Sequence, residues 1–205
     1  MHLILVGDSV FDNGNYVDQG QAVGDHLKRF LPKNVLLTSL AIDGHFSAHI
    51  YHQLDRLPAT ASHIALSAGG NDALAVLHLL ETPCVSISDA LTHLSQFQRK
   101  FETDYLRLKR RLENLGLPLL VCTIYDAVPE LPVYLKAGLS LFNDVITRSI
   151  HHDRNECLDL RECLKEAIDF SEESPIEPSS IGGKKIAEQI SRWVCRHDTN
   201  ATKNL

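Results

Sequence analysis

The sequence predicts a three-layer α/β/α sandwich around a five-stranded parallel sheet, and two observations support that prediction. Short apolar runs with the length of buried strands recur along the chain, and segments with helical periodicity separate them. This alternation is typical of βαβ units, in which helices cover both faces of a parallel sheet. The chain has 205 residues, of which 44% are hydrophobic and 22% are charged, and this composition favours a globular protein with a full core.

Five apolar runs are predicted to be buried strands of this sheet. They cover residues 2–6, 35–40, 63–67, 118–123 and 156–160. Loops are expected at the carboxyl ends of these strands, and the chemically notable residues of the chain fall in those loops. That coincidence is the first sign of a site.

Helices are expected between and after these strands. The clearest one is predicted over residues 88–115, where apolar side chains keep three- and four-residue spacing along one stripe. Further helices are predicted over 138–151 and 181–195. His151 and His152 are expected to close the second of these, because an imidazole favours the negative end of the helix dipole.

We expect one domain over residues 1–197 and a flexible tail over 198–205, since no repeat, low-complexity block or linker divides the chain. The net charge is −6 and the basic residues are dispersed, so nucleic acid is not an expected partner.

The first apolar stretch ends at Gly7, which predicts neither a signal peptide nor a membrane span and makes the cytoplasm the expected location. Five cysteines without a CxxC pair predict neither a disulfide framework nor a zinc site. The composition gives no sign of a particular oligomeric state.

A Gly-Asp-Ser turn follows the first predicted strand. Ser9 comes directly after Gly7 and Asp8, at the carboxyl end of the strand, where open parallel sheets gather their active sites. Its hydroxyl is a candidate nucleophile, and Asp8 is expected to be a structural residue of the turn. Taken alone, these three residues are more typical of an ordinary turn.

Two further loops with glycine follow the second and third strands. Gly44 allows a positive φ and exposes a backbone N–H. Gly69 and Gly70 loosen the backbone before Asn71, whose amide offers a neutral donor at the same edge of the sheet. Fixed donors stabilise the negative charge that acyl transfer builds on a carbonyl oxygen.

With these blocks the sequence resembles the SGNH hydrolases, also called the GDSL esterase/lipase family. GDS at 7–9, Gly44 and GGND at 69–72 match three of the family's four blocks, in order. The resemblance implies a flavodoxin-like strand order and Ser9 as the nucleophile. It also implies an oxyanion hole formed by the Ser9 N–H, the Gly44 N–H and the Asn71 side chain. The expected activity is serine ester hydrolysis through an acyl-enzyme, with no metal and no organic cofactor.

The fourth block departs from the family pattern. Where the family has Asp-x-x-His-Pro, this chain has Ser174 at the aspartate position and Glu177 at the histidine position. We interpret Glu177 as the base, because a carboxylate within hydrogen-bonding reach accepts a proton from a serine hydroxyl. A carboxylate has no tautomer to be set, so the orienting aspartate is unnecessary.

Two alternatives to this interpretation stay open. In the first, the base is lost and the protein is a non-catalytic pseudo-esterase that binds an acyl or acetyl ligand. In the second, another group such as His45 is the base. Asp12, His45 and Ser174 are predicted as accessory residues of the site. A glutamate base with a pKa between about 4.3 and about 6 would retain activity at mildly acidic pH, where a histidine is protonated.

The expected substrate is a small carboxylic ester. The segment 73–88 and the stretch 125–132 are expected to form the pocket walls, with Leu74, Tyr125 and Val128 against the acyl group. No apolar lid helix is evident, which favours a small soluble ester over bulk lipid. A thioesterase or a peptidase-like hydrolase is the nearest alternative within the same chemistry.

Overall fold

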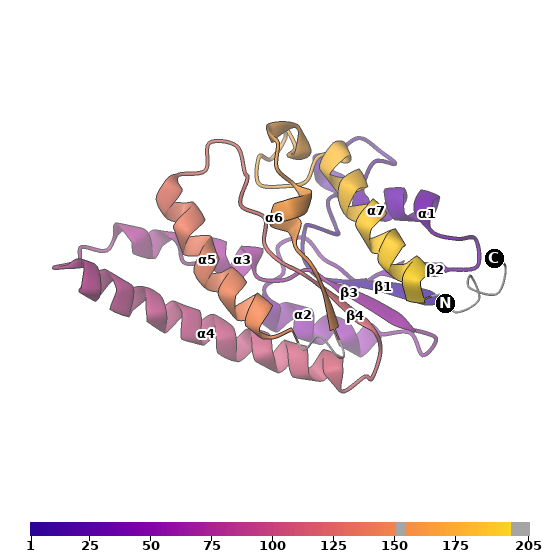
Figure 1. Cartoon of the computed structure of the whole chain (residues 1–205), viewed down its shortest axis with the longest axis horizontal. Coiled ribbons are helices and arrows are strands. Elements are labelled where there is room, and N and C mark those ends of the chain that lie inside the picture. Colours follow the sequence, from indigo (N-terminus) through magenta and orange to yellow (C-terminus); the bar gives the residue numbers. More distant parts are fainter. Residues whose placement is uncertain (151–154, 198–205) are drawn as a thin grey trace.

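The structure is a computed structural model of the chain, and it describes residues 1–150 and 155–197. Its five strands are all parallel and lie in the order β2-β1-β3-β4-β5 (Figure 1). This is the flavodoxin-like order, so the predicted fold class is confirmed. The strands are β1 (His2–Val6), β2 (Leu36–Ser39), β3 (His63–Leu66), β4 (Leu119–Cys122) and β5 (Asn155–Leu158).

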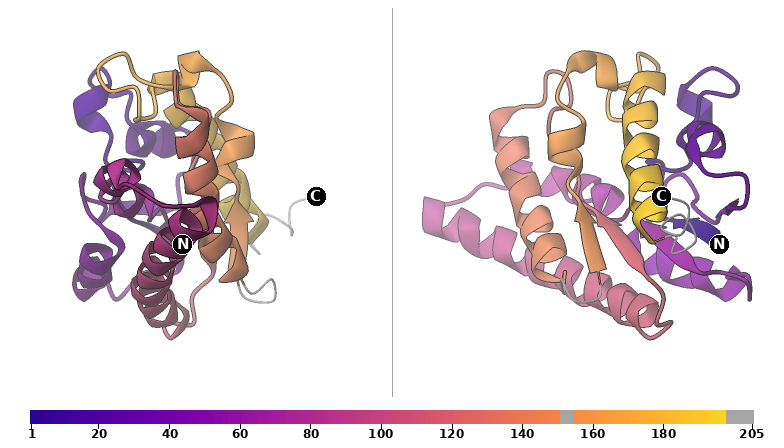
Figure 2. Two further views of the ribbon diagram at one scale, coloured as in Figure 1. Left: turned by 90° about the vertical axis from the view of Figure 1, so that its left-hand side faces the viewer. Right: turned by 45° about the vertical axis from the view of Figure 1, so that its right-hand side comes forward.

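Helices cover both faces of the sheet (Figures 1 and 2). One layer holds α1 (Val23–Phe30) and α7 (Ser180–His197), which pack against each other. The other layer holds α2 (Ser47–Gln53), α4 (Ile87–Glu113) and α5 (Val133–Arg148). The shorter helical segments are α3 (Gly70–Leu74), α6 (Leu160–Cys163), η1 (Gly14–Tyr16), η2 (Leu54–Arg56), η3 (Leu77–Glu81) and η4 (Ala167–Asp169).

The side chains of β1 alternate between the two layers. Leu3 and Leu5 belong to the core cluster under α1 and α7, whereas Ile4 and Val6 belong to the cluster under α2, α4 and α5. All four are 0% exposed. A central parallel strand that is covered on both faces is apolar at every position, which explains the continuous run at the start of the sequence.

The prediction that all five strands are buried is wrong for the two edge strands. Leu36 in β2 is 61% exposed, and Cys157 in β5 is exposed. Each edge strand has a neighbour on one side only, so water reaches its side chains. Which strand lies at an edge depends on the strand order, and a local apolar run does not reveal that order.

The limits of the second predicted helix also differ. It was expected over 138–151, and the structure begins it at Val133, directly after Pro132, and ends it at Arg148. A proline at a helix start removes no intrahelical hydrogen bond, so the helix can begin there. The helices predicted over 88–115 and 181–195 agree with α4 and α7 to within two residues at each end.

Some expectations lie outside the residues that the structure describes, namely those for His151 and His152 and for the tail over 198–205. The single domain over 1–197 stays a prediction. In the described part of the chain, no helix combines the length and the hydropathy that a membrane-spanning segment requires.

Candidate active site

Gly7 leads the chain from β1 into the turn that holds Ser9. β1 and β3 are paired with Val6 opposite Leu66, so Gly7 and Ser67 leave the sheet side by side. A Cβ atom at Gly7 would lie 2.4 Å from the Ser67 carbonyl oxygen, which is too close for any side chain. This close approach explains the glycine, and Ser9 follows two residues later with 7% of its surface exposed.

The backbone of Gly7 is held by the Gln53 side chain at the end of α2. Gln53 Oε1 accepts the Gly7 N–H at 2.9 Å, and Gln53 Nε2 donates to the Gly7 carbonyl at 2.7 Å. In the turn that follows, the Asp8 carbonyl accepts the N–H groups of Phe11 and Asp12. The path of the chain on both sides of the serine is therefore fixed by hydrogen bonds.

The loop after β3 brings Asn71 to the same edge of the sheet. Gly69 has a φ of 116° just before α3, a conformation that favours glycine. Asn71 lies in α3, and its Nδ2 donates to the His45 carbonyl at 3.1 Å. An amide nitrogen has two hydrogens, so this bond orients the side chain and leaves one hydrogen for a second acceptor.

Gly44 lies in the turn after β2, with a φ of 77°. Asp12 Oδ2 accepts the Asp43 N–H at 2.9 Å and so ties this turn to the Ser9 turn. In the described part of the chain, neither the Gly44 N–H nor the Ser9 N–H donates to an acceptor. The loops after β1, β2 and β3 are thus held together, and the N–H groups of Ser9 and Gly44 remain free to bind an acceptor.

Glu177 reaches the Ser9 turn from the loop before α7. Asn13, which is 0% exposed, joins the two loops: its Nδ2 donates to the Pro178 carbonyl at 3.1 Å, and its Oδ1 accepts the Val23 N–H at 2.9 Å. Glu177 is 6% exposed, and its carboxylate lies close enough to the Ser9 side chain for this hydroxyl to lower the Glu177 pKa. Its Oε2 is buried and receives no hydrogen bond of normal geometry from the residues that the structure describes.

Two buried carboxyl groups flank Ser9. Burial raises the pKa of Glu177 to about 7; the Ser9 hydroxyl opposes this shift, and the charges of Asp8 and Asp43 add to it. Burial likewise raises the pKa of Asp8 to about 7, against the hydrogen bond that Ser67 Oγ donates to Asp8 Oδ1 at 2.9 Å. A carboxyl group with a pKa near the operating pH both takes and returns a proton readily.

This pKa overturns the expectation that a glutamate base would retain activity at mildly acidic pH. A Glu177 carboxyl group with a pKa of about 7 is protonated in the same range as an ordinary histidine. The sequence-based value assumed a smaller shift, because the depth of burial is a property of the folded chain.

His45 lies next to this group of residues without joining it. Its Nδ1 faces Gln53 Nε2 at 3.1 Å, and burial lowers the pKa of its ring. The described residues that line the cavity at Ser9 do not include it. Its backbone carbonyl, which receives the Asn71 bond, is its contribution to the site.

Ser174 also stays outside the cavity lining as the structure describes it. Its backbone carbonyl accepts the Glu177 N–H at 2.9 Å, which shapes the loop below the carboxylate. Of the predicted catalytic, oxyanion-hole and accessory residues, Ser9, Asn71 and Glu177 therefore line one cavity, and the described lining does not include Gly44 or Asp12.

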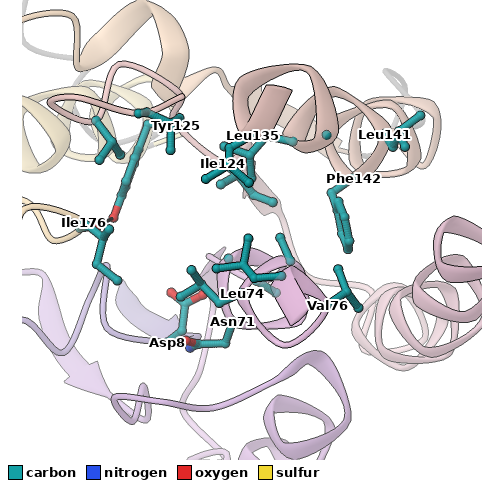
Figure 3. A pocket seen from close by; sticks show the side chains of 18 of the residues that line it. Asp8, Asn71, Leu74, Val76, Ile124, Tyr125, Leu135, Leu141, Phe142 and Ile176 are labelled. Atoms are coloured by element: carbon teal, nitrogen blue, oxygen red, sulfur yellow. Dashed lines mark hydrogen bonds between the residues drawn. The ribbon is translucent and has the colours of Figure 1, made fainter. Parts of the chain in front are cut away.

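That cavity has a volume of about 240 Å³. It extends from Asp8 and Asn71 at one end to Leu141 and Phe142 at the other, in the space between α3 and α5 (Figure 3). Asp8 and Glu177 are the carboxylates of its lining, and both lie at the Ser9 end.

The predicted pocket residues Leu74, Tyr125 and Val128 all line this cavity. Tyr125 donates its hydroxyl to the Ile176 carbonyl at 2.5 Å, so the ring is fixed between the loop after β4 and the Glu177 loop. Both segments expected to form walls, 73–88 and 125–132, contribute lining residues.

One group of described residues has the geometry to hold a metal ion. Cys84, Asp89 and His93, at the start of α4, each place one ligand atom within 4.8 Å of the others. The described lining of the Ser9 cavity includes none of the three. The expectation of no zinc site rested on the lack of a CxxC pair, and a mixed Cys, Asp and His group is invisible to that criterion.

Sequence reasoning missed three side chains that hold the site, namely Gln53, Asn13 and Ser67. Their bonds join segments far apart in the chain: Gln53 is 46 positions from Gly7, and Asn13 is 165 positions from Pro178. No local pattern marks such partners. Asn13 alone had a signal, since it belongs to the polar turn after Ser9.

No protein-family model matches the chain, and no curated protein matches its sequence. Solved structures do match it. The lipase Lip_vut3 from a goat rumen metagenome has a TM-score of 0.72 at 16% identity, over 94% of this chain and 96% of that one. A member of the lipolytic G-D-S-L family from Veillonella parvula has a TM-score of 0.68 at 17% identity, over 95% and 97%.

The esterase EstA from Pseudoalteromonas sp. is similar over 95% of this chain and 98% of its own length, with a TM-score of 0.65 at 15% identity. At such identities a comparison establishes the fold. The chain therefore has the α/β/α fold of these esterases and lipases.

Proposed function

We propose that the chain is a serine ester hydrolase of the SGNH type, with Ser9 as the nucleophile and Glu177 as the base. The observation that carries the proposal is the buried Glu177 carboxylate, which lies beside the Ser9 hydroxyl at the polar end of a cavity. The shared fold with esterases and lipases and the GDS, Gly44 and GGND blocks support the same reaction class.

In the acylation step, Ser9 Oγ attacks the carbonyl carbon of the ester while its proton passes to the Glu177 carboxylate. The carbonyl oxygen becomes an oxyanion, for which the N–H groups of Ser9 and Gly44 and the second Asn71 Nδ2 hydrogen are donors. Loss of one such donor lowers the rate by about 10²–10³. The bond to the alcohol then breaks, the leaving oxygen takes the proton from Glu177, and the acyl group stays on Ser9.

In the deacylation step, a water molecule attacks the acyl-Ser9 carbonyl while Glu177 takes its proton. The tetrahedral intermediate collapses, the proton returns to Ser9 Oγ, and a carboxylic acid leaves. Glu177 is thus base and acid in turn, which the pKa of about 7 suits. The substrate is a carboxylic ester of small molecular size.

A fluorophosphonate probe and an ester assay test the proposal together. The Pseudoalteromonas esterase EstA is described as inhibited by monoethylphosphonate, and we expect the wild-type chain to be labelled and Ser9→Ala not to be. Glu177→Gln should lower kcat/KM for a p-nitrophenyl ester by about 10²–10⁴. Glu173→Gln removes an exposed carboxylate from the same loop and is the matched control, with unchanged turnover.

Two results would overturn parts of the proposal. A folded wild-type chain with neither labelling nor hydrolysis would be the non-catalytic acyl-binding protein instead. Hydrolysis that is lost in Ser9→Ala but unchanged in Glu177→Gln would place the base elsewhere, with His45 as the next variant to measure.

A further inference from the structure

The cavity beside Ser9 has two chemically different parts. Its polar side chains come from the ends of β1, β3 and β4, from Asn71 and from the Glu177 loop. The part that continues between the α3–η3 segment and α5 is lined by apolar side chains and one glycine (Figure 3). No basic side chain lies in the described lining, so an anionic group would find no counter-charge there, and the apolar side chains of this part offer no hydrogen-bond partner to sugar hydroxyls.

The apolar part leaves hydrophobic surface in contact with water. Leu74, Leu77 and Leu80 line the cavity, and they are 41%, 39% and 40% exposed. Exposed apolar side chains that line a cavity are typical of a ligand-binding groove. A hydrocarbon chain in the cavity would remove these side chains from water.

Gly138 is the lining residue without a side chain on this wall. It lies inside α5, where a glycine costs about 0.5–1 kcal/mol relative to alanine. Its φ is not positive, and a Cβ atom placed on it would meet no atom within 4 Å. Neither the backbone conformation nor packing within the protein requires glycine, so what it provides is open space in the cavity.

From these observations we infer that the enzyme selects esters of an acyl chain of medium length, which lies between α3 and α5, with Gly138 as a specificity-determining position. This inference rests on the proposed function. The volume of about 240 Å³ holds on the order of eight groups of water or methylene size, at roughly 30 Å³ each. The acyl carbonyl lies at Ser9 and the methyl end near Leu141 and Phe142.

A series of p-nitrophenyl esters from acetate to dodecanoate, each below its aggregation concentration, tests the inference. For the wild-type chain, kcat/KM should rise about fourfold with each methylene buried, up to a chain of roughly eight carbons, and then level off or fall. In Gly138→Leu, the ratio of kcat/KM for octanoate to that for acetate should fall at least about tenfold, because the new side chain fills the cavity.

Ala137→Leu is the matched control, because it adds a leucine at the adjacent, exposed position of α5. Its octanoate to acetate ratio should equal that of the wild-type chain. A wild-type preference for acetate, a flat chain-length profile, or an equal effect of the two leucines would each overturn the inference.

Binding of octanamide, measured by calorimetry, separates this inference from the proposed function. Octanamide is neutral and cannot be cleaved as an ester, so its binding does not depend on the base. If the chain hydrolyses no ester but binds octanamide, and Gly138→Leu abolishes this binding, the acyl-pocket inference stands and the proposed hydrolase function is wrong. If the chain hydrolyses esters with no dependence on acyl chain length, the proposed hydrolase function stands and the acyl-pocket inference is wrong.

Discussion

Gln53 binds both backbone polar groups of Gly7 across 46 positions of sequence, and it does so with 2% of its surface exposed. The two bonds hold the strand exit from which the Ser9 turn starts. Gln53→Ala would leave the buried Gly7 N–H unpaired, at a cost of about 1–3 kcal/mol, while the Gly7 carbonyl would keep only the Ile42 N–H as a donor.

We therefore expect Gln53→Ala to lower the free energy of unfolding, measured by urea denaturation, by several times the effect of Gln96→Ala. Gln96 is exposed on α4, where a substitution changes stability by less than about 0.5 kcal/mol. Equal stabilities of the two variants would show that the Gly7 bonds are not needed.

The rate of ester hydrolysis should fall below about pH 7. Glu177 must be ionised to accept the Ser9 proton, and its pKa is about 7, so log kcat/KM is expected to lose about one unit per pH unit below that value. Since the charge of Asp8 raises the pKa of Glu177, Asp8→Asn should move this acid limb to lower pH. Asp18 is an exposed carboxylate and Asp18→Asn is the control. If the acid limb of the pH profile moves equally in both variants, the Asp8 charge does not specifically raise the pKa of Glu177.

The same carboxyl group should make stability depend on pH, with a sign that follows from its raised pKa. Burial raises the pKa of Glu177 from 4.5 to about 7, so the folded state binds the proton more tightly than the unfolded state. The stability from this proton is present below about pH 4 and is lost as the pH rises through about 7.

Glu177→Gln has no charge to bury. Relative to the wild-type chain, we expect it to gain on the order of 2–3 kcal/mol in free energy of unfolding between pH 4 and pH 8. Urea denaturation at the two pH values measures this difference. If the difference in free energy of unfolding between Glu177→Gln and the wild-type chain is the same at pH 4 and pH 8, Glu177 is not desolvated in the folded state.

Gly182 should be intolerant of any side chain. A Cβ atom there would lie 2.1 Å from the Asp169 carbonyl oxygen, which also accepts the Ser179 N–H at 2.8 Å. Gly182→Ala would push α7 away from η4 and should lower the free energy of unfolding by about 3 kcal/mol or more. In Gly24→Ala, where the new Cβ meets nothing within 4 Å, a gain of about 0.5–1 kcal/mol is expected, and thermal unfolding compares the two.

The sequence predicted those parts of the molecule that depend on local pattern. The run before Gly7 is apolar at every position because β1 is central and covered on both faces, and this made the fold class predictable. Ser9 and Asn71 follow such runs directly. Their position at the carboxyl ends of the strands could therefore be predicted from the strands themselves.

Other parts depend on the tertiary arrangement and were out of reach. The exposure of Leu36 follows from the position of β2 at the sheet edge, and the pKa of Glu177 follows from its depth of burial. The bond between Gln53 and Gly7 joins two elements whose meeting no periodicity announces. Likewise, the wall of the cavity that α5 forms could not be foreseen from the sequence, because it depends on the position of α5 over α3.

The bridge from Asn13 to the Pro178 carbonyl spans 165 positions, and it bears on how reactivity arises during synthesis. Ser9 leaves the ribosome long before Glu177, which follows only after all five strands have been made. With Glu177 as the base, the nascent chain bears an inert hydroxyl throughout translation. Hydrolytic activity would arise only once the Glu177 loop and α7 pack beside the Ser9 turn.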